Sequence, residues 1–146
     1  MISYAAIREG IAWKILQCKS VSKVMIDDET TYRVGEPAIL VHLIESRQEL
    51  FSKAQVRRVL DFSVTYLAPS ETPTAEILQT GLNIVAALQP TIEFDGRKIT
   101  LDDVSGQLVN NDFHITFTLD FYDELASDES YEFMNELVFK LALEQE

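Results

Sequence analysis

The chain has 146 residues, 47% of them hydrophobic and 25% charged, which fits a single globular domain over residues 1–146. Its 24 acidic and 12 basic residues leave a net charge of -12, which opposes direct binding to a phosphate backbone. No apolar stretch approaches the ~18 residues of a membrane span, the N-terminus does not resemble a secretory signal, and the single Cys18 predicts a reducing compartment.

The first segment, SYAAIREGIAWKILQCK, predicts an amphipathic helix. Ser3 is placed to cap it, and apolar side chains recur every three or four residues. The stripe consists of Tyr4, Ile7, Ile11, Ile15 and Cys18. Because Cys18 continues this stripe, we interpret it as a packed thiol rather than a reactive one. Gly10, inside the helix, indicates close packing against a sheet.

A long hairpin is predicted next. KVMID (residues 23–27) predicts a short edge strand, and the nearly continuous apolar run AILVHLIES (38–46) predicts a central strand covered on both faces. Residues 47–55 are expected to turn the chain, and residues 55–67 to return as the second strand. The turn carries Leu50 and Phe51, two large apolar residues that a purely solvated loop would not favour.

The polar candidates of this hairpin are one histidine and two arginines. His42 lies in the most apolar strand, where a buried hydrogen-bonded residue, an interface residue and a catalytic group are alternative interpretations. Arg57 and Arg58 can bind an anion, but the nearby Asp61 and the acidic chain favour salt bridges. The candidate interface residues are Leu50, Phe51, Arg57, Arg58 and His42.

A second helix, a second hairpin and a third helix follow. PTAEILQTGLNIVAAL (73–88) predicts a helix capped by Thr74, with Gly81 on its apolar stripe. Like Gly10, Gly81 inside a helix indicates close packing against a sheet. Asp95-Gly96 is a turn signal, and Asn110-Asn111 predicts a tight hairpin before the strand DFHITFTLDFY. In that strand apolar and polar residues alternate, which places His114 on the polar face. SDESYEFMNELVFKLAL (127–143) predicts the last helix.

These elements predict an α+β fold. Two hairpins give an antiparallel sheet of about four strands, and helices packed on one face would bury its apolar side. The opposite face then remains available to water or to another copy of the chain.

No sequence motif of nucleotide, metal or hydrolase chemistry occurs. We therefore predict no catalytic residue, no cofactor and no metal, and we expect a non-enzymatic interaction protein. The acidic clusters are interpreted as solvated faces and helix N-terminal charge. Their functional alternative is a repulsive surface that lines a passage for DNA.

Several segments resemble a family of tail terminator proteins of phages and prophage-like particles from Gram-positive bacteria. IDDETTYRVGEPAILVHL is similar to the family's acidic approach to a central strand, and RRVLDFSVTYLAPSE to its basic-aromatic strand. GRKI, followed by a hairpin that closes in HITFTLDFY, and an acidic final helix continue the resemblance along nearly the whole chain. The sequence departs from the family's aromatic patterns at MID (25–27) and VGE (34–36).

The resemblance implies a structural virion protein at the tail–neck junction, made in the cytoplasm of the bacterial host. It implies a homo-oligomer, a hexameric ring that caps the tail tube, stops polymerisation and docks the neck or head. DNA would pass through the ring without specific binding. Two alternatives stay open: a head-completion or connector adaptor of the same particle, and a small acidic ligand-binding domain or enzyme that uses His42.

Overall fold

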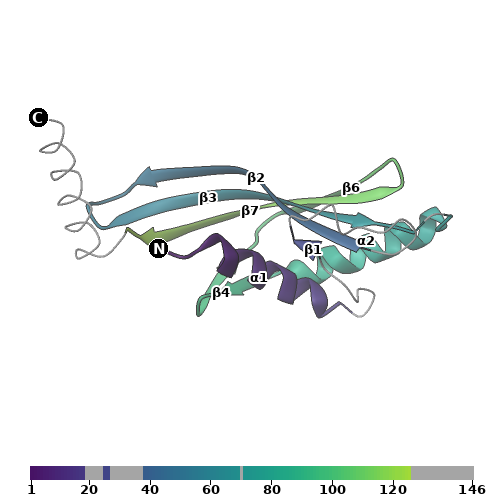
Figure 1. Cartoon of the computed structure of the whole chain (residues 1–146), viewed down its shortest axis with the longest axis horizontal. Coiled ribbons are helices and arrows are strands. Elements are labelled where there is room, and N and C mark those ends of the chain that lie inside the picture. Colours follow the sequence, from purple (N-terminus) through teal and green to yellow (C-terminus); the bar gives the residue numbers. More distant parts are fainter. Residues whose placement is uncertain (19–24, 27–37, 70, 126–146) are drawn as a thin grey trace, which may run out of the picture.

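The computed structural model describes residues 1–18, 25–26, 38–69 and 71–125 (Figure 1). In this part of the chain the order of elements is α1 (Tyr4–Leu16), β1 (Met25–Ile26), β2 (Ala38–Leu50), β3 (Gln55–Leu67), α2 (Thr74–Leu88), β4 (Thr91–Phe94), β5 (Arg97–Thr100), β6 (Val104–Val109) and β7 (Asp112–Glu124). The expected third helix, residues 127–143, lies outside the described residues.

The main sheet has the strand order β1-β2-β3-β7-β6. The β2–β3, β3–β7 and β6–β7 pairs are antiparallel, and β1 pairs in parallel with β2 at Leu40 and Val41. The α+β class, the antiparallel sheet and the short edge strand are therefore confirmed. A separate hairpin of β4 and β5 was not predicted, although the turn at Asp95-Gly96 was.

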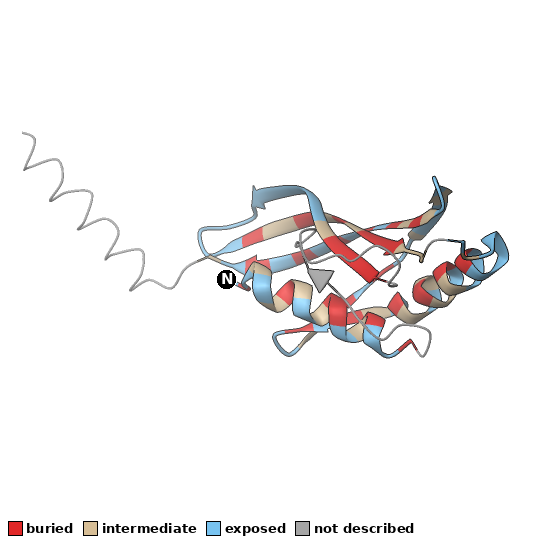
Figure 2. Ribbon diagram, turned by 45° about the vertical axis from the view of Figure 1, so that its right-hand side comes forward, coloured by how far each residue is buried: buried red, intermediate tan, exposed pale blue. Residues whose placement is uncertain are grey.

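The helices and the β4–β5 hairpin lie on one side of the main sheet (Figures 1 and 2). Strand β7 shows the reason, because its alternate residues from Phe113 to Phe121 are buried and the residues between them are exposed or half-buried. The buried face packs with Ile7, Ile11 and Ile15 of α1 and with α2 in one core. Cys18 belongs to this core, which confirms the packed thiol. The opposite face of the sheet is called the outer face below.

The two helices begin differently. Ser3 caps α1 as predicted, since its Oγ accepts a hydrogen bond from the Ala6 N–H at 3.2 Å. The prediction of Thr74 as the cap of α2 is wrong. Pro73 occupies that position with φ -58° and ψ 141°, and its carbonyl accepts from Glu76 N and Ile77 N at 3.0 and 3.2 Å. Thr74 is therefore already helical.

Strand β2 differs from the prediction of a strand covered on both faces. Ala38–Val41 are buried, but every residue from Leu43 to Leu50 is exposed. The strand pairs with β3 up to Leu50, with a bulge at Ile44, so the turn is shorter than the predicted residues 47–55. Among the described residues no strand pairs with the edge of β2 beyond Val41, and the side chains of Leu43–Leu50 are left exposed.

The tight turns follow from residues that tolerate positive φ. Asn110 and Asn111 have φ of 52° and 68°, and they join β6 to β7 as predicted. Asp95 and Gly96, with φ of 50° and 74°, join β4 to β5.

Two helical glycines mark the closest contacts of the helices with their neighbours. A Cβ on Gly81 would overlap the ring of Phe113 in β7, and a Cβ on Gly10 would overlap the carbonyl oxygen of Glu93 in β4. The prediction of close packing is confirmed at both positions, although Gly10 packs against the β4–β5 hairpin rather than the main sheet.

We expect Gly81→Ala to lower the free energy of unfolding by about 1 to 3 kcal/mol, because overpacking of Phe113 outweighs the better helix propensity of Ala. Urea unfolding measures the change. In the double variant with Phe113→Leu the loss should be less than the sum of the single losses. A stabilised Gly81→Ala protein would contradict the packing described here.

Candidate functional site

One half of the main sheet stands apart from the rest. Over Leu43–Leu50, Gln55–Asp61 and Thr118–Glu124 the sheet consists of β2, β3 and β7 alone, because β1 ends at Ile26 and β6 begins at Val104 opposite Phe117. We call this part the open half of the sheet. It carries three of the five candidate interface residues, Leu50, Arg57 and Arg58, and Phe51 follows directly after Leu50 in the turn.

The tip of the β2–β3 hairpin presents Leu50 and Phe51 to solvent. These side chains are 71% and 65% exposed. The turn is nevertheless held in place, since Phe51 N and Ser52 N both donate to the carbonyl of Gln55. The Phe51 ring also packs edge-on against Tyr122 of β7, with centroids 5.1 Å apart. The tip is thus an ordered apolar projection.

Arg57 lies on the outer face and forms a bidentate ion pair with Asp120 of β7. Its Nε and Nη2 donate to the two carboxylate oxygens at 2.9 and 2.6 Å. This hydrogen bonding lowers the pKa of Asp120 and raises that of Arg57. Salt bridging of Arg57 is therefore confirmed, but neighbouring Asp61 is not the partner. Asp61 accepts a hydrogen bond from Thr118 Oγ1 at 2.6 Å.

Arg58 points to the helix side and anchors the N-terminus. Its Nη1 donates to the carbonyl of Ile2 at 2.8 Å and to Asp123 Oδ2 at 2.9 Å. The Ile2 N–H also donates to Asp123 Oδ2 at 2.9 Å, and the guanidinium lies 5.4 Å from the centre of the Phe121 ring. The Arg58 and Asp123 side chains are only 12% and 6% exposed, so this ion pair is largely desolvated.

The charge of Asp123 is stabilised by its neighbours. Burial acts to raise its pKa, but hydrogen bonds from Ile2 N, Glu124 N and Arg58 favour the carboxylate and together hold the pKa below its ordinary value. The same group thus connects β3, β7 and the start of the chain.

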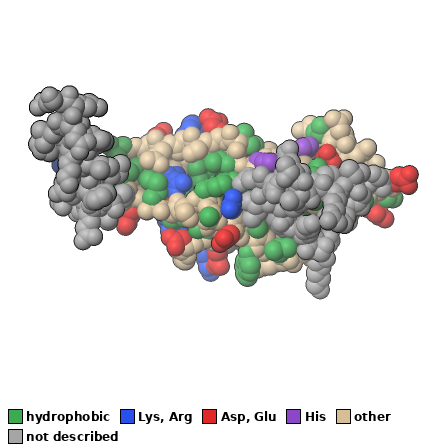
Figure 3. Space-filling model, viewed as in Figure 1, with side chains coloured by type: hydrophobic (Ala, Val, Ile, Leu, Met, Phe, Trp, Pro, Cys, Tyr) green, Lys and Arg blue, Asp and Glu red, His purple; other side chains and the backbone are tan. Residues whose placement is uncertain are grey.

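The two histidines lie on the outer face. His42 of β2 is half-buried and lies opposite Ser63, and the His114 ring is 3.2 Å from Thr65 Oγ1. Histidine side chains are visible at the surface in Figure 3. Within residues 1–18, 25–26, 38–69 and 71–125, no three His, Cys, Asp or Glu side chains are grouped to hold a metal ion.

The candidate residues therefore do not converge on one pocket. Arg57 and His42 share the outer face, Arg58 faces the helices, and Leu50 and Phe51 occupy the tip. No local sequence pattern indicated Asp120 and Asp123 as ion-pair partners, because both come from a strand more than 60 positions away.

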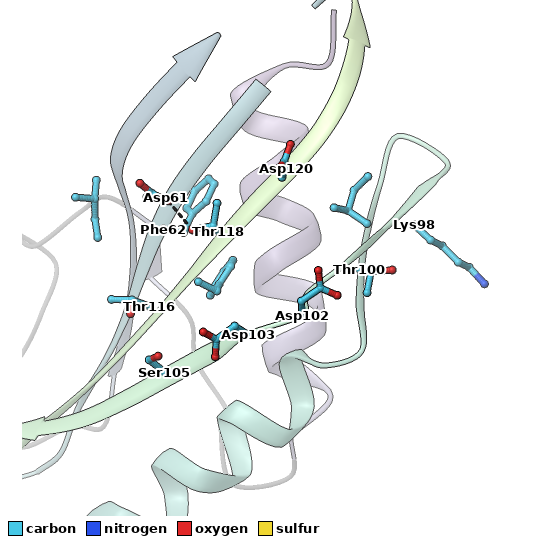
Figure 4. Close-up of a pocket in the computed structure, with 13 residues that line it drawn as sticks. Asp61, Phe62, Lys98, Thr100, Asp102, Asp103, Ser105, Thr116, Thr118 and Asp120 are labelled. Carbon is cyan, nitrogen blue, oxygen red and sulfur yellow. Dashed lines mark hydrogen bonds between the residues drawn. The ribbon is translucent and has the colours of Figure 1, made fainter. Parts of the chain in front are cut away.

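A shallow cleft of about 850 Å³ lies where the outer face meets the segment between β5 and β6 (Figure 4). Carboxylates line it, namely Asp61, Asp102, Asp103 and Asp120. Two of them are engaged, Asp61 with Thr118 and Asp120 with Arg57. Lys98 points away from the cleft (Figure 4) and lies 3.4 Å from Glu93. The cleft is thus an acidic surface on which two of the four carboxylates are already hydrogen-bonded.

No helix within the described ranges combines the length and apolar character needed to cross a membrane.

The comparisons with known proteins support one family. Residues 6–132 match a family described as phage tail terminator protein. No curated protein matches the chain. One solved structure aligns with 84% of this chain and 93% of its own at 16% identity, with a TM-score of 0.41, a similarity too low to support a conclusion about function.

We expect Asp123→Asn to lower the free energy of unfolding by about 3 to 5 kcal/mol at pH 7, because Arg58 would stay buried without its counter-charge. The control Asp120→Asn removes an exposed pair and should cost much less. Urea unfolding of both variants measures the difference.

The effect of Asp123 should also depend on pH. A carboxylate with a lowered folded pKa contributes its full stability above the unfolded pKa of ~3.9 and loses it as the pH falls through the folded pKa. The difference in free energy of unfolding between wild type and Asp123→Asn should therefore become smaller only at acidic pH. A gap that widens on acidification would contradict this assignment.

Proposed function

The chain belongs to the phage tail terminator family, and we propose that it caps the tail tube as a ring, ends tail polymerisation and provides the docking surface for the neck. Family membership makes it a structural protein of the phage tail, a component of the virion rather than an enzyme. The match extends over residues 6–132 and so includes every described strand.

The observation that carries the proposal is the exposed apolar tip at the end of the open half. Exposed apolar groups gathered on an ordered projection mark a contact with another protein. Phe51 is fixed against Tyr122, and Leu125 N donates to the carbonyl of Ala54, so the tip loses little freedom on docking. A ring needs a contact between two different surfaces of identical subunits, and a projecting tip supplies one of them.

The charge of the chain supports a passage for DNA. The net charge of -12 repels a phosphate backbone. On the outer face Arg57 is already held by Asp120, and hydroxyl groups of Ser63, Thr116 and Thr118 occupy neighbouring positions. A surface of this kind would let DNA slide past without specific binding.

The terminating role is tested by deleting the gene for this protein from a strain that produces the particles. We expect tails of irregular and excessive length, because nothing would then stop the addition of tube subunits. Electron micrographs give the length distribution, and a plasmid copy of the gene should restore it. Tails of uniform normal length that lack only heads would contradict termination and favour the connector alternative.

The tip is tested by the double variant Leu50→Ser/Phe51→Ser. We expect at least a tenfold loss of intact particles, while the thermal midpoint of the monomer falls only slightly, because both side chains are mostly exposed and only the contact of Phe51 with Tyr122 is lost. The control Leu78→Ser/Leu82→Ser changes two α2 residues that are 38% and 58% exposed. If the tip variant supports normal assembly, the tip is not the contact.

A further inference from the structure

The open half of the sheet ends in two unpaired edges. Within the part of the chain that the structure describes, no strand pairs with Leu43–Leu50 of β2 or with Thr118–Glu124 of β7 on the side away from β3. Each edge carries a row of backbone N–H and C=O groups that can pair with another strand. The two edges are of similar length and lie at the same end of the molecule (Figure 1).

The direction of the strands decides which pairing a ring permits. β2 and β7 are both antiparallel to β3, so they run parallel to each other. Copies related by rotation about an axis along the strands keep this direction. The β7 edge of one copy and the β2 edge of the next would therefore pair in parallel, whereas a twofold dimer would pair β2 with β2 or β7 with β7 in an antiparallel manner.

The backbone phase of the two edges fits parallel pairing. At the turn, Phe51 N donates to Gln55 O, so this pair is hydrogen-bonded. Hydrogen-bonded pairs alternate with non-bonded pairs along two antiparallel strands. Ser46 and Gln48 belong to the non-bonded pairs and therefore direct their N–H and C=O groups outward from β2. A two-residue turn joins β6 to β7, and the same alternation directs the groups of Asp120 and Tyr122 outward from β7. In parallel pairing, Asp120 would then bond to Ser46 and Gln48 of the next copy, on either side of Arg47.

Side chains on the outer face select one register. Across β2, β3 and β7 the rows read Glu45–Asp61–Thr118, Arg47–Val59–Asp120 and Glu49–Arg57–Tyr122. With the rows of two copies level, Arg47 of one copy lies beside Asp120 of the other. A slip of two residues in either direction places Glu45 or Glu49 beside Asp120, and like charges in that position are destabilising.

We propose that the β2 edge of one copy, Leu43–Leu50, pairs in parallel with the β7 edge of the next copy, Thr118–Glu124, with Arg47 level with Asp120. The occupant of each open edge is a second copy of this chain. The inference rests on the proposed ring and names the strands that close it.

A cysteine pair in one row tests the pairing. In the level register Glu45 lies beside Thr118 of the next copy at ~4.8 Å, a separation that a disulfide can bridge. Within one copy the same two positions are separated by β3, about 9.6 Å apart, so an internal disulfide is excluded. The variant Glu45→Cys/Thr118→Cys should therefore give a ladder of linked copies on mild oxidation.

A matched pair keeps the same edges in the wrong register. Glu49→Cys/Thr118→Cys offsets the thiols by about 13 Å along the strands and should give no ladder. Gln48→Pro, added to the Glu45→Cys/Thr118→Cys protein, removes an outward N–H and leaves the hydrogen bonds between β2 and β3 intact. It should abolish the ladder of linked copies, whereas Gln48→Ala should retain that ladder. Circular dichroism confirms that each variant folds. The wild type, with Cys18 buried, is the oxidation control.

The variants are oxidised in purified tail particles and as concentrated purified chain. The pairing is supported if, in either preparation, Glu45→Cys/Thr118→Cys gives a ladder and Glu49→Cys/Thr118→Cys gives none. The pairing is overturned if neither preparation gives a ladder, or if both cysteine pairs give equal ladders. Disulfide-linked dimers of a variant that carries only Glu45→Cys would also overturn it. Detection of the chain in the particles tests the proposed function separately. A chain present there without a ladder contradicts only the edge pairing, and a ladder from a chain absent from particles contradicts only the tail role.

Discussion

A β-strand carries hydrogen-bonding groups along both edges, so every open sheet ends in two rows of groups that water or another chain must satisfy. In this protein β1 and β6 extend the sheet at one end only, and beside the open half the described residues contribute no further strand. The fold of the rest of the molecule leaves this half accessible for the contact that we propose. In the open half the helix side of the sheet is buried, whereas most side chains of the outer face and the tip lie at the surface (Figure 2).

The buried ion pair of Arg58 and Asp123 holds the open half against the rest of the chain. It joins β3 and β7 to the backbone of Ile2, directly before α1. A projection held in this way keeps its edges and tip in a single arrangement before any partner arrives, which lowers the entropic cost of assembly. In the proposed ring, fold stability and assembly would therefore share these residues. The exposed pair of Arg57 and Asp120 adds charge at the edge itself.

Local sequence patterns predicted the structural features that depend on residues close together in the sequence. The alternation in β7, the cap at Ser3 and the Asn110-Asn111 turn each act within a few residues, and each was predicted correctly. The β4–β5 hairpin was missed because its strands have four residues each, too few for a periodic signal. The cap of α2 was misplaced by one residue, because Thr74 is already helical and the extended Pro73 occupies the cap position without a side-chain hydrogen bond.

The candidate site was less accessible to sequence reasoning. The apolar run 38–46 predicted burial, but coverage of a strand depends on where its neighbours end, and β1 pairs only with Leu40 and Val41. The partners of Arg57 and Arg58 come from β7 and follow from the register of the β3–β7 ladder, which no local pattern encodes. The tip with Leu50 and Phe51 was found because two large apolar residues in a turn are unusual.

The proposed pairing would join the two open edges in the assembled tail, and hydrogen exchange of single amides measures this directly. In the free chain the outward amides of Gln48 and Asp120 should exchange far faster than the inward amide of Arg47. In purified tails all should be protected to a similar degree. Outward amides that exchange in tails as rapidly as in the free chain would contradict the edge pairing.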